Sequence, residues 1–264
     1  MRSQEITKLQ KLERLQKGVQ DVWNNWDEVD SVEHLSQERQ RAWKKLLTSV
    51  AATESSELVL MGALLDGFKH QPEIQSYFVS HQMDERRHHR HLNQYVLKTF
   101  GYFKRKSTLS DKVVYETLFP KIAHLCAKSP GYGIALLLFF ESFGVTFYHL
   151  CRAQAENDHL EKLVQLIDQI EKDEKRHLAG LKILLQASMY SEWTALDLVT
   201  LDSLLAMVVL DVNFSWWAIH NRAVRRNALE VGLNPTELSQ AAFSAAAQVH
   251  RQIKTEMRRG RLWH

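Results

Sequence analysis

The chain contains little of what β-structure and interdomain linkers require. It has only four prolines and ten glycines among 264 residues, and no run in which Val, Ile or Thr alternates with polar residues. Long stretches of Leu, Ala, Lys, Glu, Gln and Arg favour helix instead. No segment has the composition of a linker between two domains. The sequence therefore predicts an all-α fold and a single domain over residues 1–264.

Cysteine, net charge and long apolar runs are also scarce. Cys126 and Cys151 form no Cys-x-x-Cys pair, which excludes a disulfide scaffold and a rubredoxin-type metal site. The formal charge is only +3, and the basic residues of 251–261 have the pattern of a solvated helix end. The longest uninterrupted apolar run, 134–140, is too short to span a bilayer, and no apolar signal region is present. We therefore expect a cytoplasmic protein without a membrane partner, for which RNA is an unfavoured partner.

A five-residue pattern occurs twice. Residues 84–88 and 173–177 both read D-E-x-R-H, and a repeat of four residue types at the same offsets rarely arises by chance. A third Glu-x-x-His, at 156–159, lies in a polar Asn-Asp stretch that is typical of a surface turn. In D-E-x-R-H the Glu and the His share one face of one helical turn. Two such turns facing each other could hold two metal ions.

Turn-forming residues divide the chain into predicted helices. Pro72 is well placed to begin the helix that carries the first motif. The S-P-G-Y-G segment at 129–133 is expected to break the chain before an apolar helix, and Asn157-Asp158 to form the turn before the second motif. The predicted core, at about 40–186, comprises helices over 36–68, 72–100, 111–128, 134–155 and from the turn to about 186, with accessory helices at 5–30 and 194–259.

The second motif has an acidic partner in the preceding helix. Glu141 lies sixteen residues before Asn157, and Glu174 lies seventeen after it. In an antiparallel pair that rises about 1.5 Å per residue, the two carboxylates are level. Glu141 also lies among phenylalanines, where an ionised carboxylate is favourable only beside a compensating charge such as a cation. Glu141 is therefore a candidate metal ligand.

The first motif has two possible acidic partners. Height relative to Pro72 favours Glu57, whereas the sequence separation from Glu85 favours Glu54. These two arguments disagree, and both carboxylates remain candidates at this point.

The aspartate and arginine of each motif suggest a supporting role. Asp84 and Asp173 precede the motif glutamates by one residue and so point toward a neighbouring helix. There each could accept the free N–H of the histidine in the other motif, with Arg87 and Arg176 paired to the aspartates. The competing interpretation is a set of surface salt bridges. Four carboxylates and two imidazoles, without thiolate, favour iron or manganese.

These residues resemble the ferritin-like diiron-carboxylate proteins, whose four-helix core carries Glu, Glu-x-x-His, Glu and Glu-x-x-His in chain order. The residue pattern of the motif is similar to that of bacterial multicomponent monooxygenase hydroxylases. Its second copy is also similar to the motif of acyl-carrier-protein desaturases. In the monooxygenases a Gly follows the first Glu by eight positions, as Gly62 follows Glu54, so the resemblance favours Glu54 and leaves Glu57 as the alternate. It implies a ferritin-like four-helix bundle with two iron ions, or manganese and iron, held by Glu54, Glu85, His88, Glu141, Glu174 and His177.

The resemblance also implies an activity. It indicates a non-haem diiron oxygenase or oxidase that activates O2 to hydroxylate, desaturate or otherwise oxidise a small organic or carrier-bound substrate in an apolar pocket. An external reductase is implied, because the chain has no rubredoxin-like or flavin motif of its own. The alternative is a rubrerythrin- or ferritin-like protein that handles iron or peroxide, and a homodimer is compatible with either. Leu92 stands where a ribonucleotide reductase subunit carries its radical tyrosine, which disfavours radical storage.

Several further residues are candidates near the expected metal pair. Thr146 lies next to the position, Val145, where the monooxygenases carry a Thr. His220 is a candidate extra ligand, with a buried histidine beside two tryptophans as the competing interpretation. The residues expected to line the pocket for substrate or O2 are Phe140, Phe143, Gly144, Thr146 and Phe147.

Overall fold

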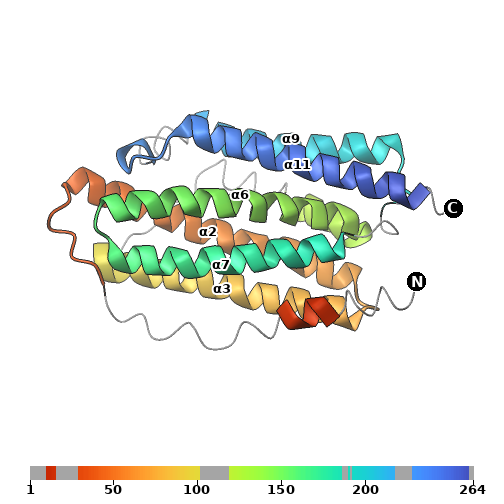
Figure 1. The fold of residues 1–264 in the computed structure, drawn as a ribbon, viewed down its shortest axis with the longest axis horizontal. Helices are drawn as coiled ribbons and strands as arrows, with labels where there is room; N and C mark the ends of the chain where they lie inside the picture. Colours follow the sequence, from red (N-terminus) through yellow and green to blue (C-terminus); the bar gives the residue numbers. More distant parts are fainter. Residues whose placement is uncertain are drawn as a thin grey trace.

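Helices make up the regular structure of the protein (Figure 1). The computed structural model describes residues 10–15, 29–101, 119–185, 190, 192–217 and 228–261, and no strand occurs among them. The prediction of an all-α fold is therefore confirmed for these residues. Of the helix predicted over 5–30, residues 10–15 are helical and residues 29–30 are not, and the others lie outside the described residues, as do 111–118 of the helix predicted over 111–128.

The first helical hairpin consists of α2 (Gln37–Gly67) and α3 (Pro72–Phe100). The side chain of Ser36 caps α2 by accepting a hydrogen bond from the backbone N–H of Arg39, at 3.1 Å. Pro72 is the first residue of α3, where its missing N–H costs nothing. The helix ends at Gly101, whose φ of 76° suits glycine. These punctuating residues explain why the bounds of this hairpin were predicted well.

The second hairpin consists of α6 (Pro130–Asn157) and α7 (Glu161–Leu184), and α5 (Phe119–Lys128) precedes it. The turn at Asn157-Asp158 is confirmed. The predicted break at 129–133 is confirmed at Ser129, between α5 and α6, but it is shorter than predicted because α6 already begins at Pro130. The two glycines of this segment serve packing: an added Cβ would lie 2.6 Å from the Leu64 side chain at Gly133 and 2.9 Å from the Trp193 ring at Gly131. Glycine here permits close approach within a helix.

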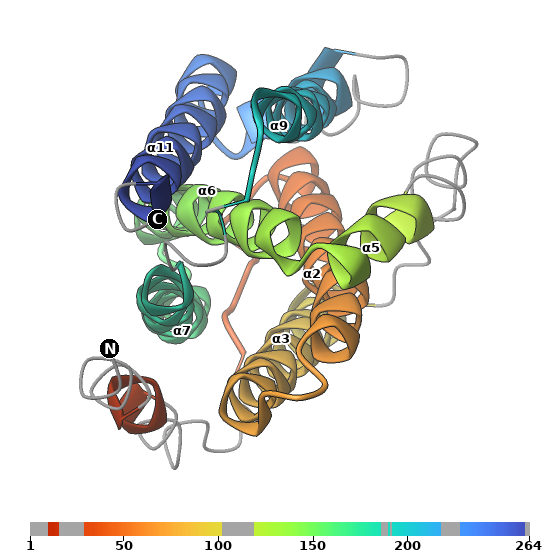
Figure 2. The ribbon, with the colours of Figure 1, turned by 90° about the vertical axis from the view of Figure 1, so that its right-hand side faces the viewer.

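The two hairpins pack against each other and carry a further layer. α2 contacts α6, and α3 contacts α7, so that four helices surround a common interior (Figures 1 and 2). The accessory helices α9 (Ala195–Trp217) and α11 (Pro235–Arg261) pack against each other and over α6. Two accessory helices were expected over 194–259, and the structure has both.

Two hydrophobic clusters lie along the four helices, with the polar residues of the motifs between them. On α3, Phe78 belongs to one cluster and Leu92 to the other. On α6, Phe139 and Tyr148 mark the same two clusters, with Glu141 between them. The polar residues of the motifs, which we call the charged layer, therefore have apolar side chains on both sides along the bundle. This apolar surrounding strengthens electrostatic interactions within the layer.

The central helix, α6, is long and apolar enough to cross a membrane by length and composition alone. However, 56% of its most apolar window is buried inside the protein. α6 contacts α2, α5, α7, α9 and α11. These contacts account for its apolar composition as that of a core helix.

Candidate metal centre

The structure brings the six predicted ligands together from four helices. α2 supplies one glutamate, α6 supplies another, and α3 and α7 each supply the glutamate and histidine of a motif. All six residues are buried, at no more than 6% exposure: Glu54, Glu85, His88, Glu141, Glu174 and His177. They form two adjacent groups, which we call position A and position B.

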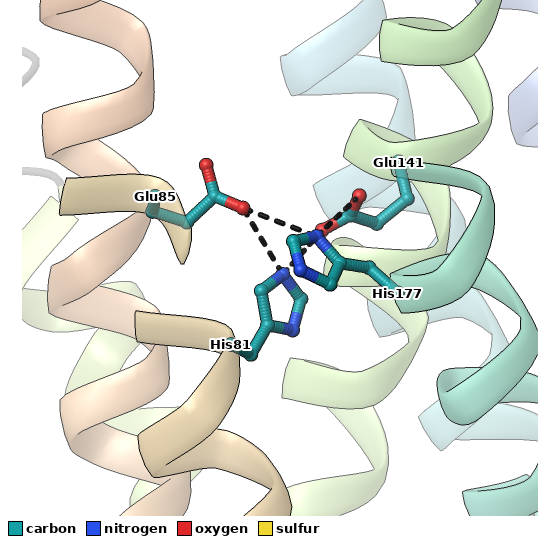
Figure 3. Close-up of side chains that lie close together, drawn as sticks. All are labelled: His81, Glu85, Glu141 and His177. Carbon is teal, nitrogen blue, oxygen red and sulfur yellow. Dashed lines mark ion pairs between the residues drawn. The ribbon is translucent and has the colours of Figure 1, made fainter. Parts of the chain in front are cut away.

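Position A is formed by His81, Glu85, Glu141 and His177 (Figure 3). Nε2 of His81 lies 2.7 Å from Oε1 of Glu141 and 3.3 Å from Oε1 of Glu85. Nδ1 of His177 lies 3.2 Å from the same Glu85 oxygen and 3.5 Å from Oε2 of Glu141. One potential ligand atom of each residue therefore faces a common centre.

Position B is formed by Glu54, Glu85, His88 and Glu174. Nδ1 of His88 lies 3.4 Å from an oxygen of each of the three glutamates. Glu85 belongs to both positions, and it faces them with different atoms: Oε1 lies at position A and Oε2 at position B. This is the geometry of a carboxylate that could bridge two cations.

The donor atoms fit metal ions. Divalent cations bind oxygen and nitrogen donors at about 2.1 Å, which sets neighbouring donors about 3 Å apart. The donor atoms of each position all lie within 4.8 Å of one another. Both oxygens of Glu85, both of Glu141 and Nδ1 of His177 are buried and make no hydrogen bond to the protein. Because buried polar atoms are costly without partners, cations would satisfy these.

The electrostatics of the centre also favour cations. Burial and repulsion from Glu85 raise the pKa of Glu54 to about 8, and burial and neighbouring carboxylates raise the pKa of Glu174 well above its ordinary value. Burial opposes ionisation of Glu141 too, but the imidazoles of His81 and His177 hold its pKa at about 2. More carboxylates share this interior than the nearby imidazoles can neutralise. Bound cations would supply the missing positive charge.

The outer nitrogens of the motif histidines contact the aspartate of the opposite motif. Nε2 of His88 lies 3.2 Å from Oδ2 of Asp173, and Nε2 of His177 lies 3.1 Å from Oδ2 of Asp84. A carboxylate can only accept, so each Nε2 donates, and in the neutral imidazole each Nδ1 faces the centre with its lone pair. The crossed pairs are those that the spacing of the two motifs suggested.

The arginines of the motifs hold both aspartates. Arg176 lies 2.6 Å from Asp84 and 2.8 Å from Asp173. Arg87 pairs with Asp84 and lies 4.0 Å from Asp173. The side chains of the two arginines are partly exposed, at 21% for Arg87 and 16% for Arg176. The network therefore connects the buried histidines to the surface of α3 and α7.

The structure distinguishes the two acidic candidates on α2. Glu54 belongs to position B, and its Oε1 accepts a hydrogen bond from the hydroxyl of Tyr148. Glu57 is buried but belongs to neither position. Its pKa is raised well above the ordinary value by burial and by repulsion from Glu141. The donor groups therefore include Glu54, which the sequence separation and the resemblance favoured, and not Glu57, which the height relative to Pro72 favoured.

The residues expected to line a pocket lie in different surroundings. An added Cβ at Gly144 would lie 3.0 Å from Oε2 of Glu174, so this glycine permits the close approach of that carboxylate. Thr146 is exposed, and its hydroxyl lies 3.5 Å from the carbonyl oxygen of Ser142 on its own helix. Five residues separate it from Glu141, which turns it off the inner face. The phenylalanines pack with the hydrophobic clusters: Phe140, Phe143 and Phe147.

A small cavity adjoins position A. Its volume is about 10 Å³, which is room for roughly one water molecule. Its lining includes both histidines of position A, and none of the predicted pocket residues: Leu15, Tyr77, Ser80, His81, Asp84, Arg176 and His177. His220, the candidate extra ligand, lies outside the described residues.

Sequence reasoning missed His81. It lies four residues before Glu85 and therefore on the same face of α3. Its side chain is 1% exposed, and neither ring nitrogen makes a hydrogen bond. The available signal was the full spacing H-x-x-x-E-x-x-H at 81–88, but only the Glu-x-x-His part was considered.

Neither models of protein families, nor curated proteins, nor solved structures match this chain. The argument for a function therefore depends on the side chains of the centre.

Proposed function

We propose that the protein is a ferritin-like diiron oxygenase or oxidase, which uses O2 to oxidise a small organic or carrier-bound substrate with electrons from an external donor. The observation that carries the proposal is the placement of Glu85, whose two oxygens face two separate groups of buried donors. A single buried ion pair would not require the two oxygens of one carboxylate to face separate groups of donors. Two cations about one carboxylate width apart account for it.

The chemistry of the donors supports iron. Carboxylates and imidazoles without thiolate suit iron and manganese better than copper or structural zinc. When bound, a reduced iron pair supplies the electrons that O2 needs, which none of the side chains of the centre can supply alone. A mixed manganese and iron pair has the same ligand requirements.

The residues of the chain have identifiable roles in this proposal. Asp84 and Asp173 hold the two motif histidines in the tautomer that directs Nδ1 inward. The two hydrophobic clusters exclude bulk water from the charged layer. Gly144 lets the carboxylate of Glu174 lie close to α6, because a Cβ there would be only 3.0 Å from Oε2. These are binding, orienting and excluding functions.

A second function is favoured by one observation. The cavity beside position A has room for about one water molecule, and O2 and hydrogen peroxide are of similar size. A protein that handles iron or peroxide, as rubrerythrins and ferritins do, needs no larger space. This alternative shares the same metal centre and differs in what reacts there.

Anaerobic iron loading followed by oxidation tests both functions. We expect the purified protein to bind two Fe2+ ions per chain and to consume O2 on exposure to air. With an added chemical reductant, an oxidase or oxygenase consumes O2 repeatedly, whereas a peroxide scavenger consumes added peroxide faster than O2. Glu85→Ala, which removes the shared carboxylate, is the control that should do neither. Failure of the folded wild-type protein to bind iron would overturn the proposal.

A further inference from the structure

The two metal positions are built from different donors. Position A has two imidazoles and two carboxylates, whereas position B has one imidazole and three carboxylates. His81 makes the difference. At the equivalent place in the second motif, four residues before the glutamate, the chain has Ile170, which is fully buried in the apolar cluster. The repeat is therefore broken at one point that faces the centre.

The His81 ring is held where a ligand would be. Its Nε2 points at the carboxylates of Glu85 and Glu141, and its ring stacks on that of His177 with centroids 3.6 Å apart (Figure 3). The imidazole is nine-tenths buried or more; its Nε2 faces the two carboxylates without a well-aligned hydrogen bond, and its Nδ1 has no hydrogen-bond partner among the described residues. A metal ion on Nε2 would also compensate the charge of the two carboxylates.

The other nitrogen of His81 differs from those of the motif histidines. Nε2 of His88 and Nε2 of His177 donate to aspartates, but Nδ1 of His81 has no such acceptor. The cavity of about 10 Å³ lies against His81 and has room for roughly one water molecule, which could accept this N–H. Metal-bound histidines commonly donate their second N–H to a water.

We propose that His81 is a metal ligand and that it makes position A the position that selects iron more strongly, while position B, with a single imidazole, discriminates less between iron and manganese. This inference rests on the dinuclear centre proposed above. Binding strength rises from Mn2+ through Fe2+ to Co2+ at nitrogen-containing sites, and hard carboxylate sites suit Mn2+. A second imidazole therefore steepens the preference for Fe2+ and Co2+ over Mn2+ at position A.

Competition between Co2+ and Mn2+ in the full-length metal-free protein tests the inference, because Co2+ is a stable probe of the nitrogen preference. We expect rising Co2+ to displace Mn2+ from the Mn2+-loaded wild-type protein in two steps, first from position A and only at higher Co2+ from position B. In His81→Ile, which restores the residue of the second motif, the affinity of position A for Co2+ falls by at least about tenfold, the lower limit known for loss of even an outer partner of a ligand. Elemental analysis measures how much Co2+ and Mn2+ each protein binds. The electron paramagnetic resonance signal of Mn2+ follows its displacement by Co2+, from which the relative affinity is obtained.

A second variant and a second measurement guard against misfolding. His81→Gln retains the size and polarity of the side chain, and His91→Gln is the matched control, since His91 is a buried histidine on α3 that belongs to neither position. In the Co2+-loaded wild-type protein, proton NMR should show exchangeable, paramagnetically shifted N–H signals from three imidazoles. Two such signals, or unchanged Co2+ preference in both His81 variants, would overturn the inference and leave the dinuclear centre standing. Absence of any metal binding by the wild type would overturn both.

Discussion

The two helical hairpins carry the same motif, but different residues surround it in each hairpin. Asp, Glu, Arg and His occupy equal offsets in α3 and α7, and the aspartate–histidine contacts cross symmetrically between them. The first hairpin adds His81 and Glu57 to the interior. At the equivalent places the second hairpin has Ile170 and Gly144. The shared residues define two similar positions, and the added ones make the positions chemically unequal.

The largest expected effect comes from the residue that both positions share. Glu85→Ala should abolish binding of both ions, because Glu85 contributes an oxygen to each position. Its counterpart in the second motif, Glu174, belongs to position B alone. Glu174→Ala should therefore lose one ion and keep the other. Elemental analysis of protein loaded under anaerobic conditions measures the difference.

The two variants check each other. Burial and neighbouring carboxylates raise the pKa of Glu174, whereas despite its burial the neighbouring imidazoles lower the pKa of Glu85, so Glu85→Ala is the more destabilising of the two, and the comparison uses the folded apoproteins as judged by circular dichroism. Equal loss of metal in the two variants would show that the hairpins contribute equivalently, contrary to the geometry of Glu85.

A smaller effect is expected from the crossed aspartates. Asp84→Asn and Asp173→Asn keep the shape of the side chain but can no longer fix the histidine tautomer through a charged acceptor, which typically costs about 10- to 100-fold in metal affinity. Asp84 pairs with both arginines closely, whereas Asp173 lies 4.0 Å from Arg87. We therefore expect the Asp84 variant to lose more affinity than the Asp173 variant. Titration of the metal-free proteins with Fe2+ gives both constants, and the opposite order would contradict the asymmetry.

The metal-free protein should lose stability as pH rises, through buried groups with raised pKa values, of which Glu54 and His177 are two. Burial and repulsion from Glu85 raise the pKa of Glu54 to about 8, and despite its burial the charge of Glu141 raises the pKa of His177 to about 9. In both cases the folded state holds its proton more tightly than the unfolded state, so stability is greatest below the unfolded pKa and is lost as pH rises through the folded one. Thermal unfolding should therefore move to lower temperature between pH 6.5 and 9.

Two comparisons test this assignment. Glu54→Gln removes the titration of Glu54 and should reduce the slope of Tm against pH. Metal-loaded protein should show the reverse slope, because binding of the ions displaces the protons. A metal-free protein whose Tm is constant over this range would show that these groups are not protonated in the folded state.

The helices and most of the centre were open to prediction because the controlling signals are local. Pro72 and the Asn157-Asp158 turn fix where helices begin and end, and helical spacing alone puts Glu85 and His88 on one face. What failed depends on partners distant in the sequence. The predicted break of 129–133 is confined to Ser129, because Gly131 and Gly133 lie inside α6, and their packing against Trp193 and Leu64 is visible only in three dimensions. His81 was missed for the same reason, since a histidine four residues from a glutamate gains meaning only when Glu141 and His177 lie opposite.

The smallest expected effect concerns how the second helix of each hairpin begins. α3 begins with Pro72, and neither it nor α7 has a side-chain cap of its own. Asp30 supplies the cap for α7: its two oxygens accept from the backbone N–H of Lys162 at 2.9 Å and of Leu163 at 3.0 Å. The hydroxyl of Tyr95 also donates to Asp30, at 2.8 Å.

Asp30→Ala should destabilise the protein by about 1–3 kcal/mol, because it removes a helix cap and leaves the buried Tyr95 hydroxyl without this acceptor. At about 2–4 °C per kcal/mol in a protein of this size, Tm falls by several degrees. Gln71→Ala, at the corresponding position before α3, should change Tm little, since that side chain makes no capping hydrogen bond. Asp30→Asn keeps one acceptor and should fall between the two. If Asp30→Ala and Gln71→Ala unfold at the same temperature, the start of α7 does not depend on this remote aspartate.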